Sequence, residues 1–216
     1  MNQAASEPTG QPSSELSRWD TRFGASDDYI FGTEPNRFLV ENAKVLKAGG
    51  SVLSLADGEG RNGVWLAQHG FDVCAVEGSV VALEKARKLA AKKGVSPRFI
   101  HADLSQWDFG QHMFDGVVAI FIQFCGPELR RQLFERTIAA LKPGGYLLLQ
   151  GYRPEQLEYK TGGPSAIENL YTEEQLRREL AELEFISLHS YDAELSEGAG
   201  HKGMSALIDL VARKPK

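Results

Sequence analysis

The 216-residue sequence offers little for covalent or metal cross-linking, because it contains only two cysteines. Cys74 and Cys125 lie within apolar runs, without C-x-x-C spacing and outside any His/Cys cluster typical of a metal site. We therefore expect two reduced core side chains in a cytoplasmic protein, with no disulfide and no bound metal.

Long hydrophobic runs and an excess of positive charge are also missing. No apolar run approaches the roughly 20 residues of a membrane-spanning helix, and the first residues lack the charged start and apolar stretch of a secretory signal. Lys and Arg number 24 against 29 Asp and Glu, giving a net charge of −5. We expect no membrane and no nucleic-acid partner.

Large apolar side chains are scarce at the start of the chain. Residues 1–17 are rich in Ser, Pro, Gln, Gly and Glu, and Leu16 is their only large aliphatic side chain after Met1. Such a segment buries too little apolar surface to offset the entropy of ordering. The sequence predicts a disordered tail over residues 1–17 and a single domain over residues 18–216, which is long enough for a sizeable core.

Residues 51–77 carry the strongest pattern in the chain. An apolar run leads into the glycine-rich turn of residues 57–63, a helical pattern follows, and a second apolar run ends at Glu77. Glycines let a backbone approach a ligand closely, and the following helix points free N–H groups at the same place. A carboxylate roughly 20 residues after such a turn accepts ribose hydroxyls. We predict a nucleotide or nucleoside site here rather than a plain strand-to-helix connection.

The rest of the chain alternates strand and helix patterns. Too few residues separate the last two strands for a crossover helix, so these two should pair as an antiparallel hairpin. The sequence predicts an α/β fold: a doubly wound, mostly parallel sheet with helices on both faces. Helices are expected at residues 79–93, 128–141 and 172–183, and the later strands at residues 97–101, 114–121, 146–149, 185–191 and 205–212.

Four of these segments together resemble the motifs of the class I S-adenosylmethionine-dependent methyltransferases: residues 52–62, 76–77, 102–104 and 141–145. The resemblance implies a seven-stranded, Rossmann-like methyltransferase fold with S-adenosylmethionine as the cofactor. Asp103 would accept from the adenine amine, and Glu77 would bind the ribose. The cofactor contacts that it implies are Ala56, Gly58, Gly60, Asn62, Glu77, Asp103 and Leu104.

An aromatic lead-in of Trp19, Phe23 and Tyr29, together with residues 58–62, is most similar to the tellurite-resistance and thiopurine methyltransferase group. That likeness implies a segment that closes over the site, with Trp19 against the cofactor and Tyr29 facing the acceptor. It also implies a small acceptor, such as a thiol, selenium or tellurium species.

The chain departs from the family pattern at two positions of the first motif. Ser54 stands where an acidic residue is usual, so it offers a hydrogen bond but no charge to the cofactor's amino group. Ala56 stands where the first glycine is usual, and an alanine is tolerable there if the position keeps negative φ.

Residues that follow the fourth and fifth strands should line the acceptor end of the site, because ligands bind at the carboxyl ends of parallel strands. The candidates are Phe121 beside the cofactor, and Gln123, Tyr152, Arg153 and Tyr159 around the acceptor. The competing interpretation makes them a satisfied core amide, core tyrosines and a surface arginine.

His201 lies among glycines in the loop between the last two strands. Since the sixth strand should run parallel to the others, this loop should reach the edge that carries the glycine turn. His201 is therefore a candidate substrate-binding residue and general base, because an imidazole titrates near neutral pH. A solvated hairpin histidine is the alternative.

Together these features predict an enzyme that methylates a small-molecule acceptor by in-line displacement. Two other functions remain open. Gly58-x-Gly60-x-x-Gly63 also fits a dinucleotide fingerprint, so an NAD-dependent oxidoreductase is the first alternative. A non-catalytic protein that binds S-adenosylmethionine is the second. The oligomeric state is left open.

Overall fold

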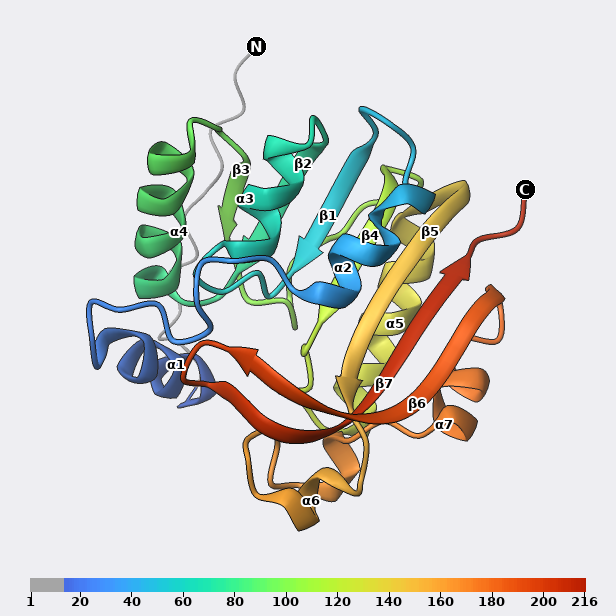
Figure 1. Ribbon diagram of the computed structural model, residues 1–216. Coiled ribbons are helices and arrows are strands. Elements are labelled where there is room, and N and C mark those ends of the chain that lie inside the picture. The colour runs from blue at the N-terminus through green and yellow to red at the C-terminus, as the bar shows by residue number, and fades with distance from the viewer. Residues whose placement is uncertain (1–13) are drawn as a thin grey trace.

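A single mixed sheet forms the centre of the molecule in this computed structural model, which describes residues 14–216. Its seven strands follow the order β3-β2-β1-β4-β5-β7-β6 (Figure 1). Six run in one direction, and β7 alone is antiparallel to its neighbours β5 and β6. The predicted fold class is therefore confirmed. The strands are β1 (Ser51–Leu55), β2 (Asp72–Glu77), β3 (Arg98–His101), β4 (Phe114–Ile120), β5 (Leu141–Tyr152), β6 (Glu184–Glu197) and β7 (His201–Arg213).

Helices cover both faces of this sheet. The helices α2, α3 and α4 cover one face, and α5 and α7 cover the opposite face (Figure 1). The helices and 3-10 turns are α1 (Ser14–Gly24), α2 (Arg37–Asn42), η1 (Ala43–Val45), α3 (Arg61–Gln68), α4 (Val80–Lys93), α5 (Pro127–Ala140), α6 (Gln156–Tyr159), η2 (Ile167–Asn169) and α7 (Glu173–Glu179).

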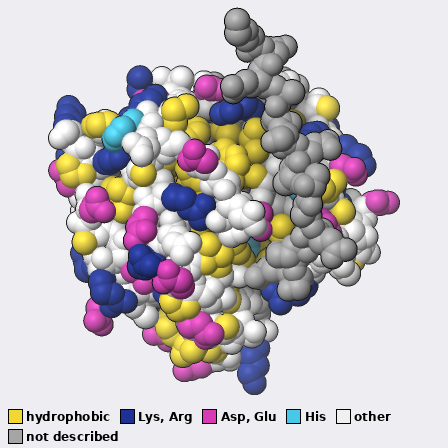
Figure 2. Space-filling view, turned by 180° about the vertical axis from the view of Figure 1, so that it is seen from behind, with side chains coloured by type: hydrophobic (Ala, Val, Ile, Leu, Met, Phe, Trp, Pro, Cys, Tyr) yellow, Lys and Arg dark blue, Asp and Glu magenta, His cyan; other side chains and the backbone are white. Residues whose placement is uncertain are grey.

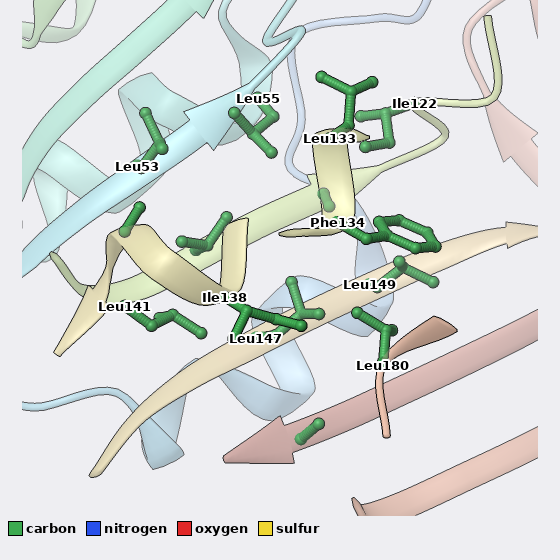
Figure 3. Packing of buried hydrophobic residues seen from close by; sticks show 14 of the residues in the cluster. Leu53, Leu55, Ile122, Leu133, Phe134, Ile138, Leu141, Leu147, Leu149 and Leu180 are labelled. Atoms are coloured by element: carbon green, nitrogen blue, oxygen red, sulfur yellow. The ribbon is translucent and has the colours of Figure 1, made fainter. Parts of the chain in front are cut away.

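The core has two layers because successive side chains of a strand point to opposite faces. In β1, Val52 packs with the α2 and α3 layer, whereas Leu53 packs with the α5 layer. Figure 3 shows this second layer, in which Phe134 and Ile138 of α5 meet Leu147 of β5. These side chains are at most 5% exposed. Burial of each such side chain stabilises the fold by about 1.5–3 kcal/mol.

Helix starts follow capping residues that are visible in the sequence. Ser79 Oγ accepts from the Ala82 amide at the start of α4, and Thr172 and Gln175 form a capping box at α7. Asn36 likewise accepts from the Leu39 amide at the start of α2. Because these bonds satisfy amides that the helix itself leaves unpaired, they fix where each helix begins.

The terminal hairpin is longer than the sequence indicated. Its strands extend to Glu197 and His201, so the loop shrinks to a tip of residues 198–200. This tip lies on the segment before α2: the Gly200 amide donates to Ile30 O at 2.8 Å. A Cβ at Gly198, where φ is 71°, would stand 2.4 Å from Gly32 N, so this approach needs glycine.

The predicted N-terminal tail falls partly outside the described residues, which exclude 1–13. Its last residues, 14–17, form the first turn of α1 instead of a tail. Leu16 lies against Gly78, at the edge of the central cavity. The apolar side chain that seemed isolated in the sequence thus has a tertiary contact, which the composition of a 17-residue window does not reveal.

Both cysteines are buried, and neither forms a disulfide. Over the described residues, 14–216, the helices are too short or too polar to cross a bilayer. In the same part of the chain, no cluster of three or more His, Cys, Asp or Glu side chains could hold a metal ion. On the face shown in Figure 2, acidic and basic side chains are interspersed.

Candidate active site

A cavity of about 930 Å³ opens at the carboxyl ends of the parallel strands. Its walls come from α1, from the turns after β1, β2, β3, β4 and β5, and from the tip of the hairpin. The order of the sheet reverses between β1 and β4, which is the usual ligand crevice of an open α/β sheet. The predicted site residues that line it are Trp19, Ala56, Gly58, Asn62, Glu77, Asp103, Leu104, Phe121, Gln123, Tyr152 and His201.

The turn after β1 forms the floor of this cavity. Gly58 has φ of 58°, a left-handed conformation that favours glycine. Ala56 also has positive φ, 46°, so the condition under which an alanine is tolerated without strain is not met. The Asp57 amide donates to Val76 O in the neighbouring strand, and that bond holds the turn in place. An alanine in this region carries a strain of roughly 1–2 kcal/mol.

Ser54 has a different role from the acidic residue that it replaces. Its hydroxyl donates to Asp57 Oδ1 at 2.5 Å, and the same oxygen accepts from the Gly63 amide in the first turn of α3. Asp57 therefore places a carboxylate at a helix N-terminus, where a negative charge is favoured. Burial nevertheless raises the pKa of Asp57 to about 7, although the hydrogen bonds from Ser54 and Gly63 oppose this shift. The second oxygen of Asp57 is buried without a hydrogen-bond partner.

This raised pKa makes the stability of the fold depend on pH. The native state holds the Asp57 proton more tightly than the unfolded chain, so stability is lost as pH rises toward about 7. Between pH 5 and 8, the parent should lose about 3 kcal/mol relative to Asp57→Asn, whose side chain does not titrate. Urea denaturation without cofactor measures this difference, with exposed Asp72→Asn as control. Parallel pH curves for Asp57→Asn and the parent would contradict it.

Glu77, the last residue of β2, is buried beside the glycine turn. Its two oxygens accept from the amides of Gly58 and Ser79, each at 2.8 Å. Burial raises its pKa although these amides oppose that shift. Each carboxylate oxygen has a further lone pair for a ligand hydroxyl. The position and the donor set fit the predicted ribose contact.

Asp103 and Leu104 follow β3 and line the same cavity. Asp103 Oδ1 accepts from the Ser105 amide at 2.8 Å, which orients the carboxylate. The strand ends at Glu77 and His101 are paired in register, so Glu77 and Asp103 lie at neighbouring strand ends. Gly58, Glu77 and Asp103 thus form a cradle that suits a nucleoside, the adenosyl part of S-adenosylmethionine.

The other half of the cavity is aromatic. The His201 ring packs at a tilt against Phe31 and Phe121, with ring centroids 4.4 and 4.3 Å apart, and Tyr152 meets it edge-on at 5.9 Å. Phe121 has φ of 56°, an uncommon backbone for an aromatic residue, and such outliers cluster at ligand sites. The predicted position of His201 at the substrate edge of the site agrees with this geometry.

Trp19 lines the mouth of the cavity from α1. Its ring stacks on Phe23 at 5.4 Å, and the guanidinium of Arg22 lies 5.0 Å from its centroid. Phe23 also lines the cavity, and it is 3% exposed. Two of the three aromatic residues of the lead-in therefore line the cavity, and the closing of this segment over the cofactor stays a prediction.

Four predicted site residues lie away from the cavity lining. Gly60 packs against Ala86 of α4, and the hydroxyl of Tyr29 donates to Lys85 O. Arg153 pairs with Asp192, and Tyr159 donates to the same carboxylate at 3.0 Å. The structure places these four residues outside the cavity lining, and their contacts with cofactor or acceptor stay predictions. Asp192 lies on β6, in the long hairpin, and contacts both Arg153 and Tyr159. Tyr29 points toward α4, where it meets Lys85.

Gln123 lies at the cavity wall, but its amide is already satisfied. Its nitrogen donates to Tyr152 O and Asn169 O, and its oxygen accepts from the Tyr152 amide at 2.6 Å. The core-amide interpretation therefore fits better than a substrate contact. Gln123 holds the ends of β4 and β5 together so that Phe121 and Tyr152 keep their places.

A buried ion pair beside His201 was not predicted from the sequence. Arg61 Nη1 lies 2.8 Å from Glu197 Oε2, and both side chains are nearly inaccessible. Asn36 Nδ2 donates to the same carboxylate at 3.1 Å. Burial alone would raise the pKa of Glu197, but His201, Arg61 and Asn36 outweigh it and lower the pKa to about 2. The i,i+4 spacing of Glu197 and His201 was the only signal available.

A second buried ion pair connects the glycine turn to the segment before α2. Lys85 Nζ lies 2.9 Å from Glu59 Oε1 and also donates to the carbonyls of Ser26 and Asp28. Glu59 Oε2 in turn accepts from the Phe31 amide at 3.4 Å. These bonds fix the segment that presents Phe31 to the cavity.

Comparison with known proteins gives a consistent result. Residues 52–145, from β1 into β5, match the family model of a methyltransferase domain. A curated relative, a glycine/sarcosine N-methyltransferase of Aphanothece halophytica, is 28% identical over 180 residues. The match covers 76% of this chain and 63% of that protein, so the chain spans less than two thirds of its relative.

Solved structures share the fold at low identity. An enzyme that converts a disulfide bond into a thioacetal group in echinomycin biosynthesis gives a TM-score of 0.75 at 16% identity, over 93% of both chains. TehB from Haemophilus influenzae gives 0.68 at 17% identity, over 92% of this chain and 67% of its own. The family match over residues 52–145 and the sheet order agree with the fold of a class I methyltransferase, and the lining of the cavity suits S-adenosylmethionine as the cofactor.

Proposed function

We propose that this protein transfers a methyl group from S-adenosylmethionine to a small-molecule acceptor by in-line displacement. One observation carries the proposal. A single cavity joins the nucleoside cradle of Gly58, Glu77 and Asp103 to an aromatic chamber that contains His201 and Tyr152. Its volume of about 930 Å³ lies within the range of small-molecule sites.

The cofactor supplies an electrophilic methyl on a sulfonium, and the residues of this chain align the two reactants. Glu77 and Asp103 would hold the ribose and the adenine. Phe31, Phe121 and Tyr152 form a wall that keeps water from the chamber. Methyl transfer needs alignment in a water-poor space more than it needs acid or base, so such a wall supports catalysis.

Two features bear on the acceptor. The relative from Aphanothece halophytica is named for nitrogen acceptors, glycine and sarcosine, which supports a small amine over a thiol, selenium or tellurium species. The aromatic lead-in and residues 58–62 support membership of the tellurite-resistance and thiopurine group. We favour the amine, because that choice also accounts for the imidazole in the chamber.

Calorimetric titration tests this function against its alternatives. S-adenosylmethionine and its demethylated product, S-adenosylhomocysteine, should bind, and NAD should give no heat. Heat with NAD alone would indicate the oxidoreductase. Binding of S-adenosylmethionine without methylation of glycine, sarcosine or thiol acceptors would support a non-catalytic binding protein.

A further inference from the structure

We propose that Glu197 and His201 act as a pair in which Glu197 fixes His201 with the proton on Nδ1, so that Nε2 removes a proton from an N–H acceptor. This inference rests on the proposed methyl transfer and specifies its acceptor class. Glu197 is a positioning residue here, and His201 is the group that touches the substrate.

The geometry orients the ring. His201 Nδ1 lies 3.9 Å from Glu197 Oε2, which is longer than a hydrogen bond, and this buried nitrogen has no hydrogen-bond partner. The ring is held between Phe31 and Phe121, so it has little freedom to turn. Since Nδ1 lies on the Glu197 side and His201 lines the cavity, Nε2 is the nitrogen left for a ligand.

The surrounding charges keep Glu197 ionised. Arg61 lies 2.8 Å from it, and the amide groups of Asn36 and Arg37 donate to its Oε1. A carboxylate held in this way accepts an N–H and stabilises an imidazolium once one forms. A buried His201 without this partner would have no group to compensate its charge.

The groups around His201 also keep it neutral before the reaction. Burial lowers its pKa, Glu197 opposes that shift, and the charges of Arg61 and Arg22 add to the lowering. Tyr152, which faces the ring from β5, is itself un-ionised, because burial raises its pKa above the ordinary value. A neutral imidazole at pH 7 has the free lone pair that a general base requires.

The step balances as follows. The acceptor nitrogen forms a bond to the methyl carbon while the bond from that carbon to the sulfonium sulfur breaks, leaving a neutral thioether. The acceptor proton passes to Nε2, and the resulting imidazolium is paired with Glu197 until solvent takes the proton. A thiolate or another ionised acceptor has no proton to give, so the pair would add nothing to its reaction.

The tautomer is measured directly on the protein bound to S-adenosylhomocysteine. Two-bond ¹H–¹⁵N spectra distinguish the two ring nitrogens, and His201→Gln identifies the His201 signals among the five histidines. The parent should show Nδ1–H with bare Nε2 at pH 7.5, and Glu197→Gln should shift His201 toward the other tautomer. Glu194→Gln, an exposed carboxylate on the same strand, should leave it unchanged. An Nε2–H tautomer or an imidazolium in the parent would overturn the proposal.

Turnover tests the base itself. With sarcosine and glycine as acceptors, His201→Gln should lower the rate about 100-fold or more, and Glu197→Gln roughly 10- to 100-fold. The affinity of both variants for S-adenosylhomocysteine should stay within about 3-fold of that of the parent. The control His189→Gln, at an exposed position, should keep both its turnover and its affinity within the same about 3-fold range. Transfer to 2-mercaptoethanol at pH 9 should be nearly insensitive to His201→Gln. The proposal would be overturned if His201→Gln methylated the amines as fast as the parent, or if the parent methylated only the thiol. If the parent did not bind the cofactor, only the proposed function would be overturned.

Discussion

Replacing Lys85 by alanine should lower the free energy of unfolding by about 3–5 kcal/mol. Its ammonium is 2.9 Å from Glu59 Oε1, and their side chains are only 10% and 2% exposed. Loss of the ammonium leaves the Glu59 carboxylate buried without a counter-charge. It also leaves the carbonyls of Ser26 and Asp28 without their donor.

Urea denaturation of Lys85→Ala checks this value, with Lys88→Ala as the matched control on the exposed face of the same helix. The control should change stability by less than about 0.5 kcal/mol. The double variant Glu59→Gln/Lys85→Met should recover part of the loss, because it removes both charges together. A Lys85→Ala protein as stable as the control would show that the ion pair is weak.

Replacing Glu77 by alanine should weaken the binding of S-adenosylmethionine roughly 10- to 100-fold, or about 1.5–3 kcal/mol. The carboxylate is the only acidic group at the end of β2, and it faces the cavity beside the glycine turn. Its loss removes charged hydrogen bonds to the ligand. It also frees the Gly58 amide, which Glu77 holds at 2.8 Å.

Calorimetry with S-adenosylhomocysteine measures this loss of affinity. Asp72→Ala, an exposed change at the start of the same strand, should bind like the parent. Because Glu77 also supports the turn, the melting temperature of each variant separates lost contacts from a lost fold. An unchanged affinity in a folded Glu77→Ala protein would remove Glu77 from the ribose site.

The lead-in and the hairpin tip make this site depend on segments far apart in the chain. Residues 26–31 are tied to Lys85, and the tip at residues 198–200 rests on Ile30 and Gly32. Both segments bring an aromatic ring to the chamber, Phe31 from one and His201 from the other. A change in either segment should therefore act on the same end of the cavity.

The sequence by itself determined the sheet, its helices and the nucleoside half of the site. These features depend on interactions over a few residues, so the local sequence predicts them. They are the periodicity of strands and helices, the caps at Ser79 and Thr172, and the glycines after β1. Glu77 was predicted because it ends the second apolar run roughly 20 residues after the glycine turn, and Asp103 because residues 102–104 resemble a motif of the methyltransferase family.

Only the tertiary structure decided the acceptor half. Arg61 pairs with Glu197, and both Arg153 and Tyr159 contact Asp192. These contacts, like the positive φ of Ala56, depend on partners from distant elements. Those partners follow from how far the hairpin extends and where its tip rests. Hairpin length and docking are set by packing between elements, whereas the periodicity of one strand fixes only which of its side chains face the core.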